Sequence, residues 1–250
     1  MDWTTAIVLT GAAAAGLAQG VSGFAFSLVA LSIWVWAIPP QLAGPMAVFG
    51  SLAGQIVTLP WVWRGFELRL LLPLVAGGLL GVPLGILLLH WLDPDLFKLM
   101  LGVFLLVYSP LALTLPHDFK LHAGGRIADA VAGFIGGVMG GLSGASGPIP
   151  TLWTTLRGLA KETQRGVMQA FNISMHTATL TGYALTGTID EATLVMFALI
   201  APALAIPAVI GVQIFRRMPT PAFRRLVLIF LFMSGLVLCA GSVGPFIRSL

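Results

Sequence analysis

Long apolar stretches separated by short polar loops are the feature of this sequence that most limits its fold. A transmembrane helix needs about 20 consecutive apolar residues. Eight such regions can be recognised; six of them fit one span each, and the first and the fifth are longer. In chain order they cover residues 3–38, 43–63, 70–91, 97–115, 127–153, 166–186, 192–215 and 226–247. The sequence therefore predicts an all-α integral membrane protein.

The composition excludes a soluble globular domain. Charged residues make up only 9% of the 250 residues and hydrophobic residues 58%, whereas soluble domains carry about 25% charged residues. The 30 glycines and 16 prolines of so apolar a chain indicate tightly packed and interrupted membrane helices. The excess of 13 basic over nine acidic residues is small, so the lipid bilayer, and not nucleic acid, is the expected partner.

Two further features bear on cofactors and on location. The single cysteine, Cys239, lies alone within an apolar stretch, so we expect no disulfide, no metal or redox centre and no cofactor. The chain opens Met1-Asp2-Trp3 with no basic residue before its first apolar stretch, which favours a first membrane segment over a cleaved signal peptide. We therefore expect a multi-pass protein of the cell (inner) membrane. Its oligomeric state is open, a homo-oligomer included.

Small residues interrupt the first and fifth apolar regions, at residues 16–24 and 133–148, so each region is either one crossing or a bent hairpin. Positive-inside counting distinguishes these alternatives. If both regions return to the side on which they start, eleven of the 13 Lys and Arg residues, Arg165 among them, share one face, opposite Lys98 and Arg248. If each region crosses once, the split is eight to five. Two hairpins, re-entrant or fully spanning, with both termini outside the cytoplasm, are therefore predicted.

The two halves of the chain resemble each other at an offset of about 117 to 126 residues. Residues 1–120 are predicted to form a first repeat and residues 121–250 a second, each a broken glycine-rich hairpin followed by three transmembrane helices. Because three is odd, the second repeat would be inverted, as in secondary transporters whose broken helices enclose the substrate. The matching positions are Gly16, Gly20, Val21 and Gly23 with Gly133, Gly137, Val138 and Gly140; Gly44, Met46, Phe49 and Gly65 with Gly166, Met168, Phe171 and Gly187; Pro83 with Pro207; and residues 97–99 with residues 223–225.

In its two broken segments, its duplicated layout and its size, the chain resembles the TauE/SafE family of sulfite and organosulfur anion exporters. The resemblance covers almost the whole chain. Family members often carry a proline after each glycine cluster; here Pro148 and Pro150 follow the second cluster, whereas the first half reads Phe26-Ser27-Leu28. The resemblance implies a secondary transporter and not an enzyme. Its substrate would be a small anion, namely sulfite, a sulfonate or a related carboxylated sulfur compound, and its direction export.

The two breaks are the first candidates for holding such an anion. Unwound backbone exposes amide N–H groups, and the N-termini of half-helices carry positive partial charge, so an oxyanion can be held there without a buried arginine. Serine and glycine also permit close helix packing, and this alternative stays open. The candidates are Gln19, Ser22, Gly23 and Phe24 at the first break and Ser143, Gly144, Ser146 and Gly147 at the second.

A polar stripe follows the second break. Five polar residues recur at steps of three and four within residues 166–186, which places them on one face of a helix. Polar groups in lipid are costly, so this face should point into the bundle, either lining a pathway or bonding helices together. The stripe is Gln169, Asn172, His176, Thr179 and Tyr183; Asn172, His176 and, from a weaker stripe in the first half, Gln55 complete the candidate substrate site.

The acidic residues all fall at the ends of the predicted spans or in loops. This distribution excludes a buried carboxylate relay and removes the usual ligands of a coupling cation. His176 is expected deep within a span, so it is the candidate carrier if transport is proton-linked. A histidine that only packs in the core is the alternative.

Two other classes of function remain to be distinguished. Residues 141–144 and 144–147 both fit the G-x-S-G pattern of rhomboid serine-protease nucleophiles, with His176 downstream as a base. A short pattern in a glycine-rich segment arises easily by chance, and a protease would not need the matching cluster in the first half. A non-transporting membrane scaffold is the other alternative; it would bind no solute.

Overall fold

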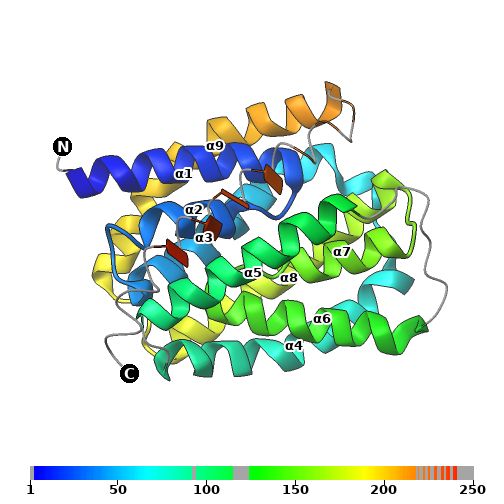
Figure 1. The fold of residues 1–250 in the computed structure, drawn as a ribbon, viewed down its shortest axis with the longest axis horizontal. Coiled ribbons are helices and arrows are strands. Elements are labelled where there is room, and N and C mark those ends of the chain that lie inside the picture. The colour runs from blue at the N-terminus through cyan, green and yellow to red at the C-terminus, as the bar shows by residue number, and fades with distance from the viewer. Residues whose placement is uncertain are drawn as a thin grey trace.

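The computed structural model describes residues 3–91, 94–114 and 124–217, together with isolated positions between 219 and 240. The described residues form helices and short connections and contain no strand, which confirms the predicted all-α class (Figure 1). The predicted span at residues 226–247 falls mostly outside the described residues, as do Met1 and Leu250.

The first apolar region is a broken hairpin. Helix α1 (Trp3–Ser22) ends at Gly23, and after two further residues helix α2 (Phe26–Trp34) runs back along it. Gly23 has φ +88°, a left-handed conformation that glycine adopts without strain and that ends a helix. At the far end of α2, Trp34 Nε1 donates a hydrogen bond to Val8 O in α1 at 3.1 Å. The second arm thus folds back onto the first.

The fifth region repeats this construction. Helix α6 (Gly125–Ser143) ends at Gly144, which has φ +72°, and helix α7 (Pro148–Leu156) folds back against α6. Both short arms, α2 and α7, contain nine residues. At 1.5 Å per residue each is roughly 14 Å long, about half of the 30 Å hydrocarbon core of a bilayer. Each short arm on its own is therefore too short to cross a membrane.

Longer helices follow each hairpin. Among the described residues, four helices are long and apolar enough to cross a membrane: α1, most of α3 with the turn after it, most of α4, and α9. The order of a long arm, a nine-residue arm and then long helices occurs in both halves, and the inverted relation between them stays a prediction. The helices after the hairpins are α3 (Pro40–Thr58), α4 (Leu68–Trp91), α5 (Pro94–Thr114), α8 (Lys161–Leu185) and α9 (Glu191–Arg217), with short 3-10 turns at Leu59–Trp61 and Trp63–Gly65.

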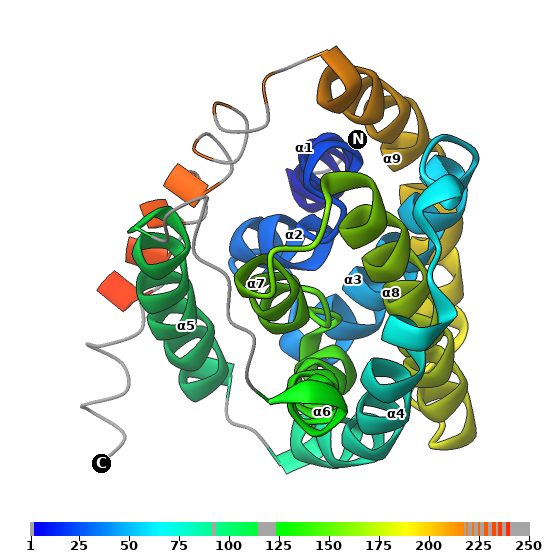
Figure 2. The same ribbon diagram turned by 90° about the vertical axis from the view of Figure 1, so that its right-hand side faces the viewer.

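The helices are arranged so that the two short arms lie in the middle of the bundle. Figures 1 and 2 show α1 beside α9 at one side, α4 beside α6 at the opposite side, and α2, α3, α7 and α8 between these pairs. Figure 2 also shows α5 standing apart from this body, where its Gly102 packs against Gly235 and Cys239. The two breaks are consequently enclosed by other helices.

Glycine allows the outer pairs to pack backbone against backbone. A Cβ added at Gly16 would lie 2.6 Å from Leu204 O of α9, and one added at Gly137 would overlap Gly78 of α4. Close approach through small residues is how helices associate in a membrane, where lipid is as apolar as leucine. Each pair joins a hairpin of one half to a long helix of the other, so the two predicted repeats form one packed unit.

Carboxylates lie at helix ends, as the sequence predicts. Asp129, near the start of α6, accepts hydrogen bonds from Arg157 Nη1 at 2.6 Å and from Trp153 Nε1 at 2.7 Å, which ties together the outer ends of the second hairpin. Asp190, just before α9, accepts hydrogen bonds from the Thr193 hydroxyl at 2.6 Å and amide at 2.8 Å. These bonds hold the pKa of the Asp190 carboxyl below its usual value.

Candidate functional site

The structure brings the two breaks into contact at the centre of the bundle. Ser27, near the start of α2, donates a hydrogen bond from Oγ to Gly144 O at 2.8 Å. Phe24 of the first break lies directly against Gly147 of the second, where an added Cβ would overlap the Phe24 side chain. Segments more than a hundred residues apart in the chain therefore form one buried centre.

Asn172 of α8 bridges the two breaks. Its Oδ1 accepts a hydrogen bond from Ser146 Oγ at 2.9 Å, and its Nδ2 donates to Gly23 O at 3.3 Å. The side chains of Asn172 and Ser146 are fully buried. Because a carbonyl oxygen can only accept, the Gly23 contact fixes which end of the Asn172 amide faces each break.

Three buried glutamines surround this centre, each with one polar atom left over. Gln55 Nε2 donates to Gly23 O at 2.6 Å, Gln19 Nε2 to Ser51 O at 2.8 Å, and Gln169 Nε2 to Gln55 O at 2.5 Å. The Oε1 atom of each is buried and has no hydrogen-bond partner among the described residues. Buried polar groups in native proteins are usually paired with protein or ordered water. These oxygens are acceptors, so they mark the centre as a polar region in which water or another hydrogen-bond donor can pair with them.

The polar stripe of α8 faces the interior, which confirms its predicted orientation. Asn172 and Thr179 are fully buried, and His176 is 2% exposed. At the far end of the stripe, Tyr183 donates a hydrogen bond from its hydroxyl to Gly141 O in α6 at 2.5 Å. The stripe thus serves partly as interhelical bonding, at Tyr183, and partly as the wall of the centre, at Asn172.

Arg165 is a residue that the sequence prediction missed. It was expected among the loop charges, and the breaks were expected to lie clear of any buried arginine. In the structure Arg165 is buried, 7% exposed, and a Cβ added at Gly23 would lie 2.7 Å from its Cζ. Because Arg165 precedes Gln169 by four residues, extending the helical stripe back by one turn would have included it. The expectation of a charge-free first break was wrong, since folding draws the start of α8 over the end of α1.

The two breaks differ in how their amides are occupied. In the first break, Ser22 Oγ accepts hydrogen bonds from Phe24 N at 3.3 Å and Ala25 N at 3.1 Å. In the second break, Ser143 Oγ instead donates to Met139 O of its own helix at 3.1 Å. Among the described residues, no acceptor takes the amides of residues 145–147. Open amides are therefore found at the second break, and the expectation that Ser143 faces the site is not supported.

No serine and histidine pair of the kind a protease needs is formed at these positions. Ser143 bonds to its own helix, Ser146 bonds to Asn172, and His176 Nδ1 is buried without a partner. Among the described residues, no group of three or more His, Cys, Asp or Glu side chains could hold a metal ion. The second break and Asn172 therefore present neutral hydrogen-bonding groups to a solute, whereas the first break also carries the guanidinium of Arg165.

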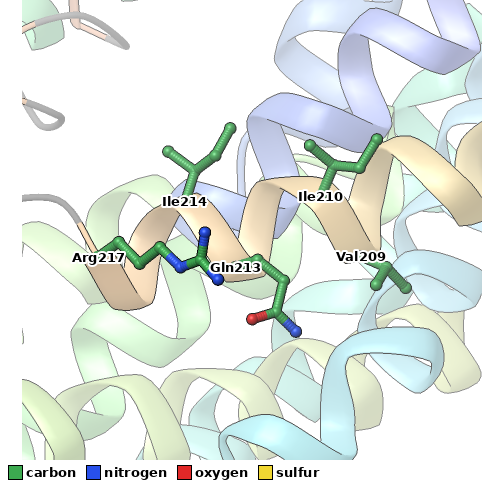
Figure 3. Close-up of a pocket in the computed structure, with 5 residues that line it drawn as sticks. All are labelled: Val209, Ile210, Gln213, Ile214 and Arg217. Carbon is green, nitrogen blue, oxygen red and sulfur yellow. The ribbon is translucent and has the colours of Figure 1, made fainter.

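A separate hollow on the outer face of α9 contains none of the candidate residues. Figure 3 shows it lined by five side chains of that one helix. Because most of its lining is apolar and it lies on a single helix, it offers few groups to a small polar solute. Its residues are Val209, Ile210, Gln213, Ile214 and Arg217.

A helical multi-pass protein whose two interrupted hairpins meet at a buried polar centre defines the class of secondary membrane transporters. The chain belongs to the family described as "Sulfite exporter TauE/SafE", whose model matches residues 7–238. It is 26% identical over 210 residues to the probable sulfite/organosulfonate exporter TauE of Cupriavidus necator, a match that covers 81% of this chain and 79% of that protein. No solved structure matches the chain.

These comparisons confirm the resemblance and the function expected from it. The protein is a membrane transporter of a sulfite exporter family, and nothing supports the intramembrane protease alternative. The family likewise implies a small anionic substrate and a lipid environment for the chain.

Proposed function

We propose that the protein exports sulfite or a small organosulfonate across the cell (inner) membrane, and that the anion binds where the second break meets Asn172. The family description and the name of the relative support the substrate class. The observation that carries the binding site is the row of amides at residues 145–147, which are buried and take no protein acceptor among the described residues.

The chemistry of the second break suits a sulfur oxyanion. A sulfonate or sulfite that leaves water needs several N–H and O–H donors, and here backbone amides, Ser146 Oγ and Asn172 Nδ2 lie within one small region. The Ser146 hydroxyl donates its hydrogen bond to Asn172 Oδ1. In the bound state it turns to the anion. Neutral donors give moderate affinity, which a transporter needs in order to release its cargo.

We further propose that the two halves are inverted repeats that alternate access to this centre, with both termini outside the cytoplasm. The recurrence of a long arm, a nine-residue arm and long helices supports the repeat. If both hairpins return to the side on which they start, ten of the 12 Lys and Arg residues other than the buried Arg165 lie on one face, and this asymmetry supports the orientation. A negative cell interior favours anion exit by about 2.3 kcal/mol per charge per 100 mV, so export needs no co-ion.

The proposal is tested by counterflow of labelled sulfite, sulfoacetate and taurine in proteoliposomes that contain the purified protein. Proteoliposomes should exchange labelled sulfite or sulfoacetate. Liposomes without the protein should exchange neither of these anions. Ser146→Ala should weaken apparent affinity by about tenfold or more, because a hydrogen bond to a charged ligand contributes roughly 1.5–3 kcal/mol. Ser143→Ala is the matched control, since its hydroxyl bonds to its own helix. Equal affinity in both variants would move the site away from the second break.

A further inference from the structure

Arg165, in the second turn of α8, forms an unusual cationic centre at the end of α1. Its Nη2 donates to Gly20 O at 3.0 Å and its Nη1 to Val21 O at 3.1 Å, both in the last turn of α1. Its guanidinium carbon lies 4.9 Å from the ring centroid of Phe215 in α9. The residue therefore joins three helices while remaining 7% exposed.

The contacts of Arg165 leave its charge without a counter-ion. Both acceptors are neutral carbonyls, and among the described residues no carboxylate forms an ion pair with it. Its Nε is buried and has no hydrogen-bond partner in the part of the chain that the structure describes. Buried charges in proteins are nearly always paired, and the partial negative charge at the C-terminus of a helix offsets only about half of a unit charge. An anion is the ligand that this centre lacks.

The position of Arg165 connects this centre to the substrate site. It lies on the same buried face of α8 as Gln169 and Asn172. At 1.5 Å per residue, the backbone positions of Arg165 and Asn172 lie roughly 10 Å apart along the helix. Both side chains nevertheless reach Gly23: a Cβ added there would lie 2.7 Å from the Arg165 Cζ, and Gly23 O accepts a hydrogen bond from Asn172 Nδ2 at 3.3 Å. An anion at the guanidinium is therefore close enough to pass to the donors around Asn172.

We propose that Arg165 is a second anion subsite, which captures the sulfur oxyanion at its end of α8 before transfer to the neutral donors of the second break. This inference rests on the proposed function. The Nε–H and the neighbouring Nη–H lie along one edge of the guanidinium and match two oxygens of a sulfite or sulfonate. The two carbonyl bonds come from Nη1 and Nη2 and leave Nε–H unused, so capture through this edge is compatible with the contact with α1.

The alternative role of Arg165 is structural, as a cation that caps α1. Both roles predict that loss of the guanidinium destabilises the protein, so stability alone does not distinguish them. They differ in ligand affinity, because a cap acts on the fold whether or not an anion is present. A lysine at this position keeps the charge and loses the paired donors, which separates the two contributions further.

The test uses purified full-length protein and sodium sulfite as the probe. Thermal shift and counterflow are measured for the wild type, Arg165→Lys, Arg165→Gln and the control Arg157→Gln, whose native side chain is already paired with Asp129. We expect Arg165→Gln to weaken apparent sulfite affinity by about tenfold or more. Arg165→Lys should lie between it and the wild type, and Arg157→Gln should retain wild-type affinity.

The outcomes separate this inference from the proposed function. If the wild type responds to sulfite and Arg165→Gln or Arg165→Lys binds it equally well in the folded fraction, Arg165 is only a cap and the subsite is overturned. If the wild type responds to neither sulfite nor sulfoacetate, the proposed function itself fails, and the subsite with it. If Arg165→Gln does not fold, the affinity of Arg165→Lys decides.

Discussion

The first and second breaks have the same backbone plan and different polar chemistry. Each follows a long helix that ends at a glycine with positive φ, Gly23 at +88° and Gly144 at +72°, and each leads into a nine-residue arm. In the first break Ser22 caps the two following amides, and Gly23 O accepts hydrogen bonds from Gln55 and Asn172. In the second break, no acceptor in the described part of the chain takes the amides of residues 145–147.

This difference indicates that the two breaks have different roles. In the first break, backbone amides donate to Ser22, and the Gly23 carbonyl accepts from α3 and α8, so these backbone groups are already paired within the protein. After the second break, α7 contains Pro148 and Pro150, which have no backbone N–H to donate. The backbone donors near the break are therefore the amides of residues 145–147, and these are available to a solute. A repeated backbone can therefore hold one binding site rather than two equal ones.

The largest effect is expected from side chains at the glycines that end α1 and α6. Any L-residue at these φ values costs roughly 1–2 kcal/mol, and an added Cβ also meets Arg165 at Gly23 and the Val48 backbone at 3.0 Å at Gly144. Overpacking adds about 1–3 kcal/mol. Gly23→Ala and Gly144→Ala should therefore greatly reduce the yield of folded protein, measured by size-exclusion elution and thermal unfolding.

Gly187 provides the matched control for both variants. It has φ +71°, and an added Cβ would meet nothing within 4 Å. Gly187→Ala should show the backbone strain alone and fold better than the other two. Equal behaviour of all three variants would mean that the breaks are not closely packed. The larger Gly23→Leu and Gly144→Leu changes should also block solute from the centre.

The bridge between the breaks should be the next most sensitive point. Asn172→Asp keeps an acceptor for Ser146 but replaces the donor to Gly23 O by a carboxylate oxygen and adds a negative charge beside the proposed anion. We expect it to abolish sulfite binding, while Asn172→Ala weakens binding by about tenfold, corresponding to roughly 1.4 kcal/mol. Binding is measured by calorimetry on protein that elutes like the wild type. Retained affinity in Asn172→Asp would exclude this centre as the anion site.

A smaller effect should separate the roles of the two serines. Ser22→Ala removes the acceptor of Phe24 N and Ala25 N, which should cost about 1 kcal/mol of stability, as loss of a hydrogen bond within a protein does. Its sulfite affinity should stay near that of the wild type, because the Ser22 hydroxyl is engaged with two backbone amides, whereas the proposed anion contacts are Arg165 and the second break. Thermal unfolding and calorimetry measure the two quantities separately. A tenfold loss of affinity in Ser22→Ala would show that Ser22 binds the anion as well.

The smallest effect concerns His176, one turn beyond Asn172. The residue is 2% exposed, and its Nδ1 has no hydrogen-bond partner among the residues that the structure describes. His176→Gln should leave sulfite affinity and folding close to those of the wild type and flatten any dependence of counterflow on pH. An unchanged pH profile in this variant would assign His176 to packing and place proton coupling, if present, elsewhere.

The sequence predicted the framework of the site better than its contacts. The length of the apolar stretches predicted the order of the helices, and the glycine positions predicted the interrupted hairpins. The spacing of three and four residues predicted the buried face of α8. The direction of single side chains was not. Ser143 and Ser146 stand three residues apart in the same glycine-rich segment, yet one bonds to its own helix and the other to Asn172.

What the sequence determined by itself is therefore local in origin: which segments are apolar enough for a membrane, where they break, and which face of α8 is polar. Only the tertiary structure decided which groups meet. Ser27 contacts Gly144 across 117 positions of the chain, and Arg165 contacts Gly20 across 145. A periodic pattern reports the environment of one helix, whereas a hydrogen bond between helices depends on how their backbones pack. Glycine allows close packing, but its position in the sequence does not show which helix will pack against it.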